Sequence, residues 1–278
     1  QYDLISKICD SMLELGWKPY QNDHEDANGQ FEMNWEYDDV LKSADRHVFF
    51  KYMTKALAEE AGFRATFMPK PFNDLTGSGC HMHVSMWKDG VNVFDDPAGE
   101  LGMSELSYRF LGGVLHSAAD LCAIYNPTVN SFKRINAAIT SSGATWSPNT
   151  ITYTGNNRTH MVRIPEAGRF EFRLMDGATN PYFAPAAILM AGLDGIANGR
   201  DPGKRLDINM YTDGHKVKNV KRLPLNLLDA LRLFSASKVV RAGFGDAVVD
   251  SYTKLKMESW NQFMSHASAW ERLHTLDV

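Results

Sequence analysis

Residues 169–173 read Arg-Phe-Glu-Phe-Arg and alternate strictly between charged and aromatic side chains. Because successive side chains of a β-strand point to opposite faces, this segment predicts a strand with two arginines and a carboxylate on one face and both phenylalanines on the other. The phenylalanine face is suited to packing on a core. The Arg/Glu/Arg row is suited to a metal ion flanked by anions such as phosphate or carboxylate. Taken alone, the segment is explained equally well by a solvated face with cross-strand ion pairs.

The composition is that of an ordinary globular chain that does not bind nucleic acid. The 278 residues are 44% hydrophobic and 22% charged, enough for one large domain or two small ones with a proper core. The net charge of -4 and the pI near 6.1, without any basic run, argue against a nucleic-acid surface. We therefore expect small-molecule partners.

The cysteines and the apolar runs predict a cytoplasmic protein. Cys9, Cys80 and Cys122 are far apart, odd in number and outside any CxxC spacing, which is typical of a reducing compartment. The longest apolar stretch, 185–197, is too short and too interrupted to cross a bilayer, and we see no targeting signal. The chain begins with Gln1 inside a helical pattern, so we expect it to be a piece of a longer protein.

Apolar periodicity predicts helices and strands in an irregular order. Helices are predicted from the start of the chain to Gly16, from a cap at Asp38 to Gly62, over 104–125, over 181–198, and throughout the tail from about Leu225. Strands are predicted over 30–37, 64–68, 80–87, 160–165 and 169–174, and a long functional loop over 126–156. This order favours an α+β fold over a doubly wound sheet.

Two carboxylates bracket a predicted turn near the start of the chain. His24 and Glu25 precede residues 27–29 (Ala-Asn-Gly), and Glu32 follows them. Two strands joined by this turn would bring Glu25 and Glu32 to one site, where carboxylates suit Mg²⁺ or Mn²⁺. Solvated acidic residues beside an Asn-Gly turn are the commoner explanation of such a segment by itself.

Two histidines follow a glycine-rich loop. His81 and His83 are two residues apart, so a strand places both on one face together with Ser85, after the loop 76–79 whose bare backbone can approach a ligand. One imidazole would bind a metal and its neighbour a phosphate. Such pairs also occur on open surfaces and in zinc sites, but no third zinc ligand lies at a recognisable spacing.

Arginines are concentrated in the second half of the chain. They are Arg134 in the long loop, beside Lys133, and Arg158, Arg163, Arg169 and Arg173. Arginine makes bidentate contacts with carboxylate and phosphate and stabilises the charge that moves in phosphoryl transfer, so the group suggests an anion clamp. Ordinary surface exposure explains any one of them more readily than all five.

Taken together, these segments resemble the catalytic domain of the glutamine synthetase family along nearly the whole chain. HEDANGQFE is similar to the family's HE(x)GQ(x)E segment, GSGCHMH to its GSG(x)H(x)H loop, and NPTVNSFKR to its glutamate-binding loop. NNRTHMVRIP and RFEFRLMDGATNPY resemble its arginine-rich strands. The resemblance implies one catalytic domain over 1–278, with a curved, mainly antiparallel sheet flanked by long helices.

The resemblance also implies ATP-dependent amide formation, in which the γ-carboxylate of glutamate is phosphorylated and a nitrogen nucleophile displaces the phosphate. Two or more Mg²⁺ or Mn²⁺ ions would bind per site, one at Glu25 and Glu32 and another at His81 and Glu171. Glutamate would be held by Gly77, Arg134 and Arg173. The nucleotide would be bound by His83, Ser85, Arg158, Arg163 and Arg169, with Arg158 and Arg134 as the catalytic residues.

The family pattern includes parts that this sequence lacks. A Glu-x-Glu strand and a β-grasp domain precede the point where this chain starts, and they supply further metal ligands and an aspartate from a neighbouring subunit. The isolated chain is therefore expected to be inactive. The resemblance implies a homo-oligomer, most readily a dodecamer with active sites between subunits. Tyr211 lacks the flanking residues of the family's modified tyrosine, so we do not predict adenylylation.

The nitrogen donor is left open by the residues after Arg134. The family's flap carries a glutamate that binds ammonium, whereas residues 135–148 (INAAITSSGATWSP) contain no carboxylate, and Thr76 stands where many members have asparagine. A flap with Trp146 suits an alkylamine, as in the branch with glutamate-methylamine ligases and type III enzymes, so the donor is methylamine or ammonia. A non-catalytic structural or regulatory relative is the alternative from another class. A guanidino kinase, whose catalytic fold resembles that of the family, is a third possibility, but it would leave the glutamate-type loop NPTVNSFKR unexplained.

Overall fold

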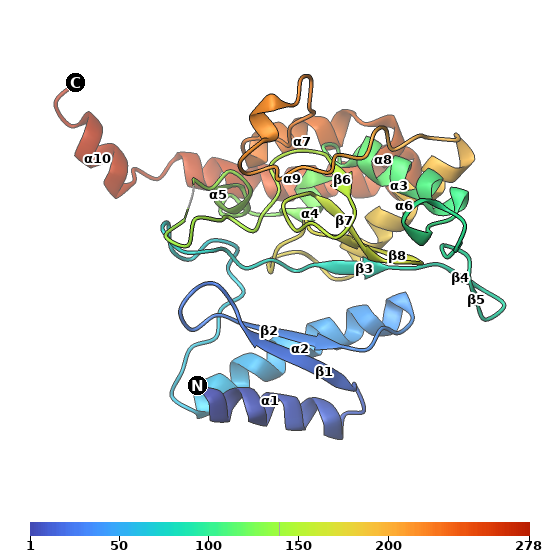
Figure 1. Cartoon of the computed structure of the whole chain (residues 1–278). Helices are drawn as coiled ribbons and strands as arrows, with labels where there is room; N and C mark the ends of the chain where they lie inside the picture. The colour runs from blue at the N-terminus through green and yellow to red at the C-terminus, as the bar shows by residue number, and fades with distance from the viewer. Residues whose placement is uncertain (139) are drawn as a thin grey trace.

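The computed structural model describes residues 1–138 and 140–278. Residues 1–63 form a separate layer, which we call the N-terminal layer, below the rest of the chain in Figure 1. It consists of α1 (Tyr2–Glu14), the antiparallel hairpin β1 (Pro19–His24) and β2 (Phe31–Trp35), and α2 (Val40–Glu60). Its own small core contains Ile5, Ile8, Met12, Trp17 and Met53.

The ends of the first two helices follow from local chemistry. Gly16 and Gly62 adopt φ of 71° and 78°, the left-handed conformation that ends a helix and that glycine accepts without strain, as predicted. The predicted cap of α2 was wrong by one residue, because Asp39 Oδ1 accepts the hydrogen bond from Lys42 N at 2.9 Å. The carboxylate of Asp38 is instead paired with the side chains of Lys42, at 2.7 Å, and Arg46, at 2.9 Å.

A four-stranded sheet lies above the N-terminal layer. Its order is β3 (Met82–Val84), β8 (Arg169–Phe172), β7 (Val162–Glu166) and β6 (Tyr153–Thr154). The β3–β8 and β8–β7 pairs are antiparallel and β6–β7 is parallel, so the prediction of a mainly antiparallel sheet is confirmed. A small hairpin of β4 (Trp87–Lys88) and β5 (Val91–Asn92) follows β3.

Helices cover the other face of this sheet, away from the N-terminal layer (Figure 1). They are α3 (Glu105–Ser117), α4 (Cys122–Tyr125), α6 (Phe183–Ala197), α7 (Leu227–Ala236), α8 (Lys238–Phe244) and α9 (Asp246–Met264). The remaining helical segments are η1 (Glu100–Gly102), α5 (Ser131–Ile135), η2 (Gly214–Lys216) and α10 (Ala269–Thr275), which projects from the body.

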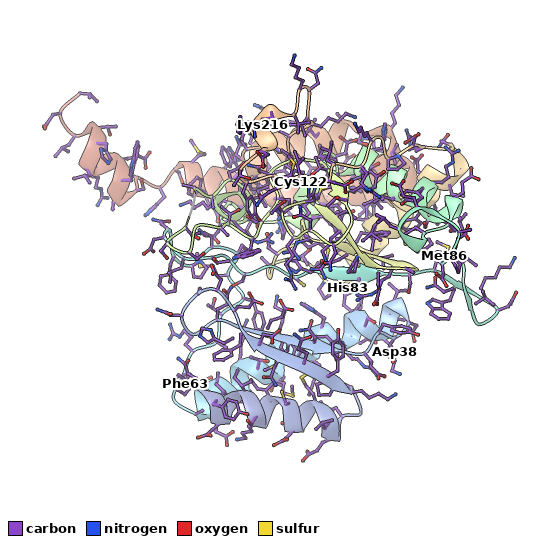
Figure 2. All side chains as sticks on the ribbon, in the orientation of Figure 1. Asp38, Phe63, His83, Met86, Cys122 and Lys216 are labelled. Carbon is purple, nitrogen blue, oxygen red and sulfur yellow. The ribbon has the colours of Figure 1, made fainter. Side chains whose placement is uncertain are left out.

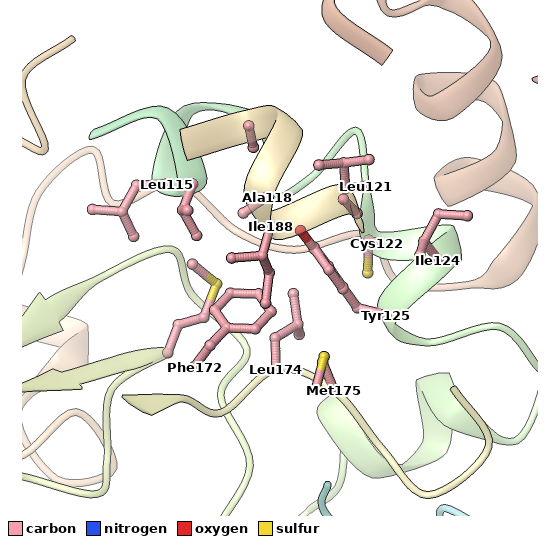
Figure 3. Packing of buried hydrophobic residues seen from close by; sticks show 14 of the residues in the cluster. Leu115, Ala118, Leu121, Cys122, Ile124, Tyr125, Phe172, Leu174, Met175 and Ile188 are labelled. Atoms are coloured by element: carbon pink, nitrogen blue, oxygen red, sulfur yellow. The ribbon is translucent and has the colours of Figure 1, made fainter. Parts of the chain in front are cut away.

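The main core lies between the sheet and these helices. Figure 3 shows Phe172 beside Leu174, Tyr125 and Ile188, and the rings of Tyr125 and Phe172 meet edge to face at 4.8 Å. Phe170 and Phe172 are fully buried, which confirms the apolar face predicted from the alternation. Helices α3 and α6 approach so closely that a Cβ on Gly113 would lie 2.0 Å from the carbonyl oxygen of Ala191.

Several predicted elements differ from the structure. Residues 64–68 have no strand partner in the described chain, because alternation predicts an extended segment but cannot supply a neighbour for its hydrogen bonds. The predicted helix over 104–125 is interrupted between Ser117 and Cys122, and the predicted loop over 126–156 contains α5 and β6. All three cysteines are free thiols. No helix within the described residues has both the length and the apolar character needed to cross a membrane.

Candidate functional site

A cavity of about 1640 Å³ separates the N-terminal layer from the sheet. All the residues predicted to act in the site line this cavity except Arg134. Figure 2 shows His83 on the side of β3 that faces the N-terminal layer. The cavity exceeds the roughly 300–1,000 Å³ of an ordinary small-molecule pocket, so it has room for more than one ligand or for additional protein.

The sheet register gathers the charged residues on the cavity side. Glu171 of β8 pairs directly with His83 of β3 and with Arg163 of β7. Directly paired residues of neighbouring strands project to the same face, so one charged row from each strand meets at Glu171. The alternation in 169–173 therefore predicted both faces of β8 correctly.

Glu171 is the centre of this charged row. Its Oε1 accepts a hydrogen bond from Arg173 Nη1 at 2.7 Å and lies 3.2 Å from His81 Nδ1. Its Oε2 lies 3.0 Å from Arg163 Nε, an ion-pair distance without an aligned hydrogen bond. Burial raises the pKa of this carboxyl, but the hydrogen bond with His81 and the charges of Arg173 and Arg163 outweigh burial and hold the pKa well below its usual range. Glu171 is therefore ionised at neutral pH.

His81 has the electronic state of a metal ligand. Burial, reinforced by the charge of Arg173, lowers the pKa of His81 to about 4, against the favourable effect of Glu171, so the ring is neutral. Its Nε2 atom is buried without a hydrogen-bond partner in the described chain. The Nδ1 atom of this ring lies 3.2 Å from Glu171 Oε1 and 3.4 Å from Arg173 Nη1. In the tautomer that carries its proton on Nδ1, the Nε2 lone pair is available to a metal.

Glu25 and Glu32 lie on the opposite wall of the cavity. Burial and then the charge of Glu32 raise the pKa of Glu25, so the two carboxylates repel each other. A divalent cation between them would relieve this repulsion, and the residues therefore fit the predicted metal. Among the described residues, no three or more His, Cys, Asp or Glu side chains form a complete metal cluster.

Arg158 and Arg169 also line the cavity. Arg169 Nε binds Glu166 at 2.6 Å, and its guanidinium also contacts His83 Nδ1. Arg158 is exposed at the cavity, and the described part of the chain gives it no hydrogen bond or ion pair. Its charge is therefore available to an anion.

Arg134 lies behind the cavity wall rather than in it. It is 2% exposed, and its guanidinium donates to the carbonyl oxygens of Leu174, at 2.9 Å, and Arg173, at 3.3 Å. Gly77 lines the cavity in front of it, where a Cβ would lie 2.5 Å from Pro69 O and 3.0 Å from Arg134 Cγ. Only glycine fits there. Contact of Arg134 with a substrate stays a prediction.

Two features of the site had no signal in the sequence. Trp87 donates its indole N–H to Ser85 at 3.0 Å and stacks on Tyr37, with ring centroids 6.0 Å apart and planes 15° apart, to form an aromatic edge of the cavity. Asp26 accepts hydrogen bonds from Thr76 and from Ser142, the latter at 2.5 Å. Both features join residues distant in sequence, so periodicity could not reveal them.

Comparison with known proteins places this geometry in one family. The model of the family "Glutamine synthetase, catalytic domain" matches residues 1–274. A glutamine synthetase of Rhizobium leguminosarum bv. phaseoli is 62% identical over 280 residues, covering 100% of this chain and 64% of the relative. A glutamate-methylamine ligase of Methyloversatilis universalis is 41% identical over 272 residues, covering 96% of this chain and 61% of the relative.

Solved structures agree with the sequence comparison. A structure described as "GmaS/ADP complex-Conformation 1" matches with a TM-score of 0.95 and 60% identity, covering 100% of this chain and 64% of that one. "Apo GmaS without ligand" matches with a TM-score of 0.93 and 57% identity, covering 100% and 63%. This chain thus spans somewhat less than two thirds of the relatives it matches. It belongs to the glutamine synthetase family and comprises that family's catalytic domain.

Proposed function

We propose that this chain is the catalytic domain of an ATP-dependent ligase that joins the γ-carboxylate of glutamate to a small amine. The reaction passes through γ-glutamyl phosphate and yields γ-glutamylmethylamide from methylamine or glutamine from ammonia. The observation that carries the proposal is the charged row around Glu171, which brings His81, Arg163 and Arg173 together on one wall of a large cavity.

The arginines provide the charge that phosphoryl transfer requires. In the first step the γ-carboxylate oxygen attacks the γ-phosphorus of ATP, and the bond to the β-phosphate oxygen breaks to release ADP. Arg163 and Arg169 line the cavity for the nucleotide, and Arg158, without a partner in the described chain, is free to neutralise the transferred phosphoryl group. In the second step the amine nitrogen attacks the acyl carbon, inorganic phosphate leaves, and the nitrogen loses a proton.

Glu25 and Glu32 on one wall and His81 and Glu171 on the other would hold Mg²⁺ or Mn²⁺ ions. When bound, such ions neutralise phosphate oxygens and orient the nucleotide. Glu171 needs no change of protonation for this task, since its low pKa keeps it ionised. His81 is fixed by its contact with the same carboxylate, at 3.2 Å.

The flap, residues 135–148, contributes an indole and no charged side chain of its own. Trp146 lines the cavity and is 36% exposed, with a left-handed backbone φ of 51°. An indole beside the donor can pack against a methyl group, whereas a flap without a carboxylate provides no charge of its own for ammonium. Relatives named glutamine synthetase and glutamate-methylamine ligase both match this chain. We keep methylamine and ammonia as the two candidates.

The relatives are longer than this chain, which covers 64% and 61% of two of them. We propose an upstream Glu-x-Glu strand and a β-grasp domain, which would complete the metal ligands missing from the described residues. Such a strand would border the cavity of about 1640 Å³ between the sheet and the N-terminal layer. We further propose a homo-oligomer, most readily a dodecamer, with active sites shared between subunits.

The decisive experiment is a mass-spectrometric product assay on the full-length protein with ATP, Mg²⁺, glutamate and equal ammonium and methylamine. A dominant γ-glutamylmethylamide product identifies an amine ligase, and dominant glutamine identifies an unusual glutamine synthetase. Absence of both products, with no ATP-dependent uptake of a divalent ion, would contradict the ligase and favour a structural or regulatory relative.

A further inference from the structure

Three loops that are distant in sequence meet at Asp26. The first is the β1–β2 turn, residues 25–30, which carries Asp26 itself. The second is the loop 74–78, whose Thr76 hydroxyl donates to Asp26. The third is the flap segment 140–147, whose Ser142 hydroxyl donates to the same carboxylate oxygen at 2.5 Å. One charged group thus connects both walls of the cavity with the flap.

Secondary contacts support the same junction. Gln30 Nε2 donates to the carbonyl oxygen of Gly77 at 3.1 Å, while Gln30 Oε1 accepts from Ala27 N at 3.2 Å. Ser141 N donates to Asp74 O at 3.1 Å. The β1–β2 turn and the flap are therefore each bonded to the loop 74–78. Among these contacts, only the bond from Ser142 to Asp26 joins the flap to the N-terminal layer.

The junction involves both segments that depart from the family pattern. Thr76 stands where many members have asparagine, and the flap contains no carboxylate. The hydroxyl groups of Thr76 and Ser142 both donate to Asp26. A carboxylate accepts such bonds more strongly than a neutral group does, because the acceptor is charged.

We propose that Asp26 is a positioning residue that closes the flap over the donor end of the cavity through Thr76 and Ser142. The closure sets Trp146 against the cavity, which Thr76 and Gly77 also line. Asp26 does not itself act on the reacting atoms. Its effect on the donor amine passes through Trp146. The kinetic consequence of this inference rests on the proposed ligase function, whereas the closure of the flap does not.

Tyr211 holds the flap from the other side. Its ring meets Trp146 edge to face, with centroids 6.5 Å apart and planes 82° apart. Ser147 Oγ additionally donates to Arg134 O at 2.8 Å. The flap therefore has a fixed end near Arg134 and Tyr211, and the Asp26 junction decides whether its middle stays closed.

The test uses hydrogen-exchange mass spectrometry on the full-length protein, with Asp26→Asn, Ser142→Ala and the matched control Ser141→Ala. Ser141 sits next to Ser142, but only its backbone N–H is engaged, and alanine keeps that group. We expect exchange of residues 140–147 to become about tenfold faster in Asp26→Asn and Ser142→Ala, and to stay unchanged in Ser141→Ala. Exchange in α3 and α6 reports whether each variant is folded.

A kinetic measurement on the same variants gives the functional arm. We expect Asp26→Asn to raise the KM for the amine about tenfold while kcat at saturating amine falls less. Unchanged exchange over 140–147 in both variants overturns the proposal, because that readout does not depend on turnover. If exchange over 140–147 is faster in the two variants than in the parent but the parent forms no amide, the junction stands and the ligase function is contradicted.

Discussion

His83 and Glu171 are directly paired residues of β3 and β8, and Arg163 of β7 pairs with the same glutamate from the other side. The register of two strand pairs thereby fixes which charges meet in the cavity. A shift of one residue in either pair would send Glu171 into the core in place of Phe170 or Phe172. The apolar face consequently stabilises the arrangement of the charged face.

Glu171→Gln should destabilise the fold. The substitution leaves Arg163 and Arg173, which are 11% and 3% exposed in their side chains, without their shared counter-charge. Removing one partner of a buried ion pair costs about 3–5 kcal/mol, and urea denaturation will measure it. Glu166→Gln is the matched control, because its carboxylate is 66% exposed, and we expect a change below about 0.5 kcal/mol. A small effect at Glu171 would show that the pair is not a net stabiliser.

The stabilisation from Glu171 should depend on pH in one direction. Its pKa is lower in the folded chain than its ordinary value of 4.5. The stabilisation is therefore complete above that value and is lost as the pH falls through the folded pKa. We expect the difference in unfolding free energy between the parent and Glu171→Gln to be constant at neutral pH and to shrink only in acid. A difference in unfolding free energy that increases as the pH falls would contradict this prediction.

Glu25→Gln should have opposite effects without and with a divalent ion. Without metal, removing one of two repelling carboxylates should stabilise the chain by about 0.5 kcal/mol, as expected for neighbouring like charges. With Mg²⁺ or Mn²⁺, the same variant should lose the rise in Tm that binding gives the parent. Thermal melts across a metal titration distinguish the two effects. Equal metal stabilisation in both proteins would remove Glu25 from the ligand set.

Arg134→Ala should raise the glutamate requirement sharply and also weaken the fold. The substitution removes two hydrogen bonds to buried carbonyl oxygens, which together contribute about 2–4 kcal/mol. Lys133→Ala is the matched control, since Lys133 is adjacent but exposed. Steady-state kinetics of the full-length protein, compared at temperatures where both variants are folded, will separate the two effects. Unchanged kinetics would remove the substrate role of Arg134.

Gly113→Ala should destabilise the helical layer. The added methyl would lie 2.0 Å from Ala191 O and 2.7 Å from Gly195 Cα, both backbone atoms that cannot move aside cheaply. We expect a loss of about 1–3 kcal/mol, the usual cost of overpacking, in chemical denaturation. Gly155→Ala is the control, because its nearest neighbour is Leu101 Cδ2 at 3.5 Å. Equal stability of both variants would mean that α3 and α6 can separate without cost.

The sequence by itself determined which residues are candidates for the chemistry and how each strand divides into two faces. The alternation in 169–173 predicted the burial of Phe170 and Phe172 and the charged row with Glu171, because the two-residue period of a strand is a local property. Helix ends at Gly16 and Gly62 were predictable for the same reason, since glycine alone adopts their backbone conformation readily. The ordered motifs likewise identified the family.

Only the tertiary structure decided which of these residues meet. The ladder that pairs His83 with Glu171, the placement of Arg134 behind Gly77 and the junction of Asp26 with Thr76 and Ser142 all join segments far apart in the chain. The segment 64–68 was predicted as a strand from the same kind of alternation that succeeded elsewhere, yet it has no partner in the described residues. A local pattern fixes the direction of side chains, whereas hydrogen-bond partners and contacts depend on how the whole chain packs.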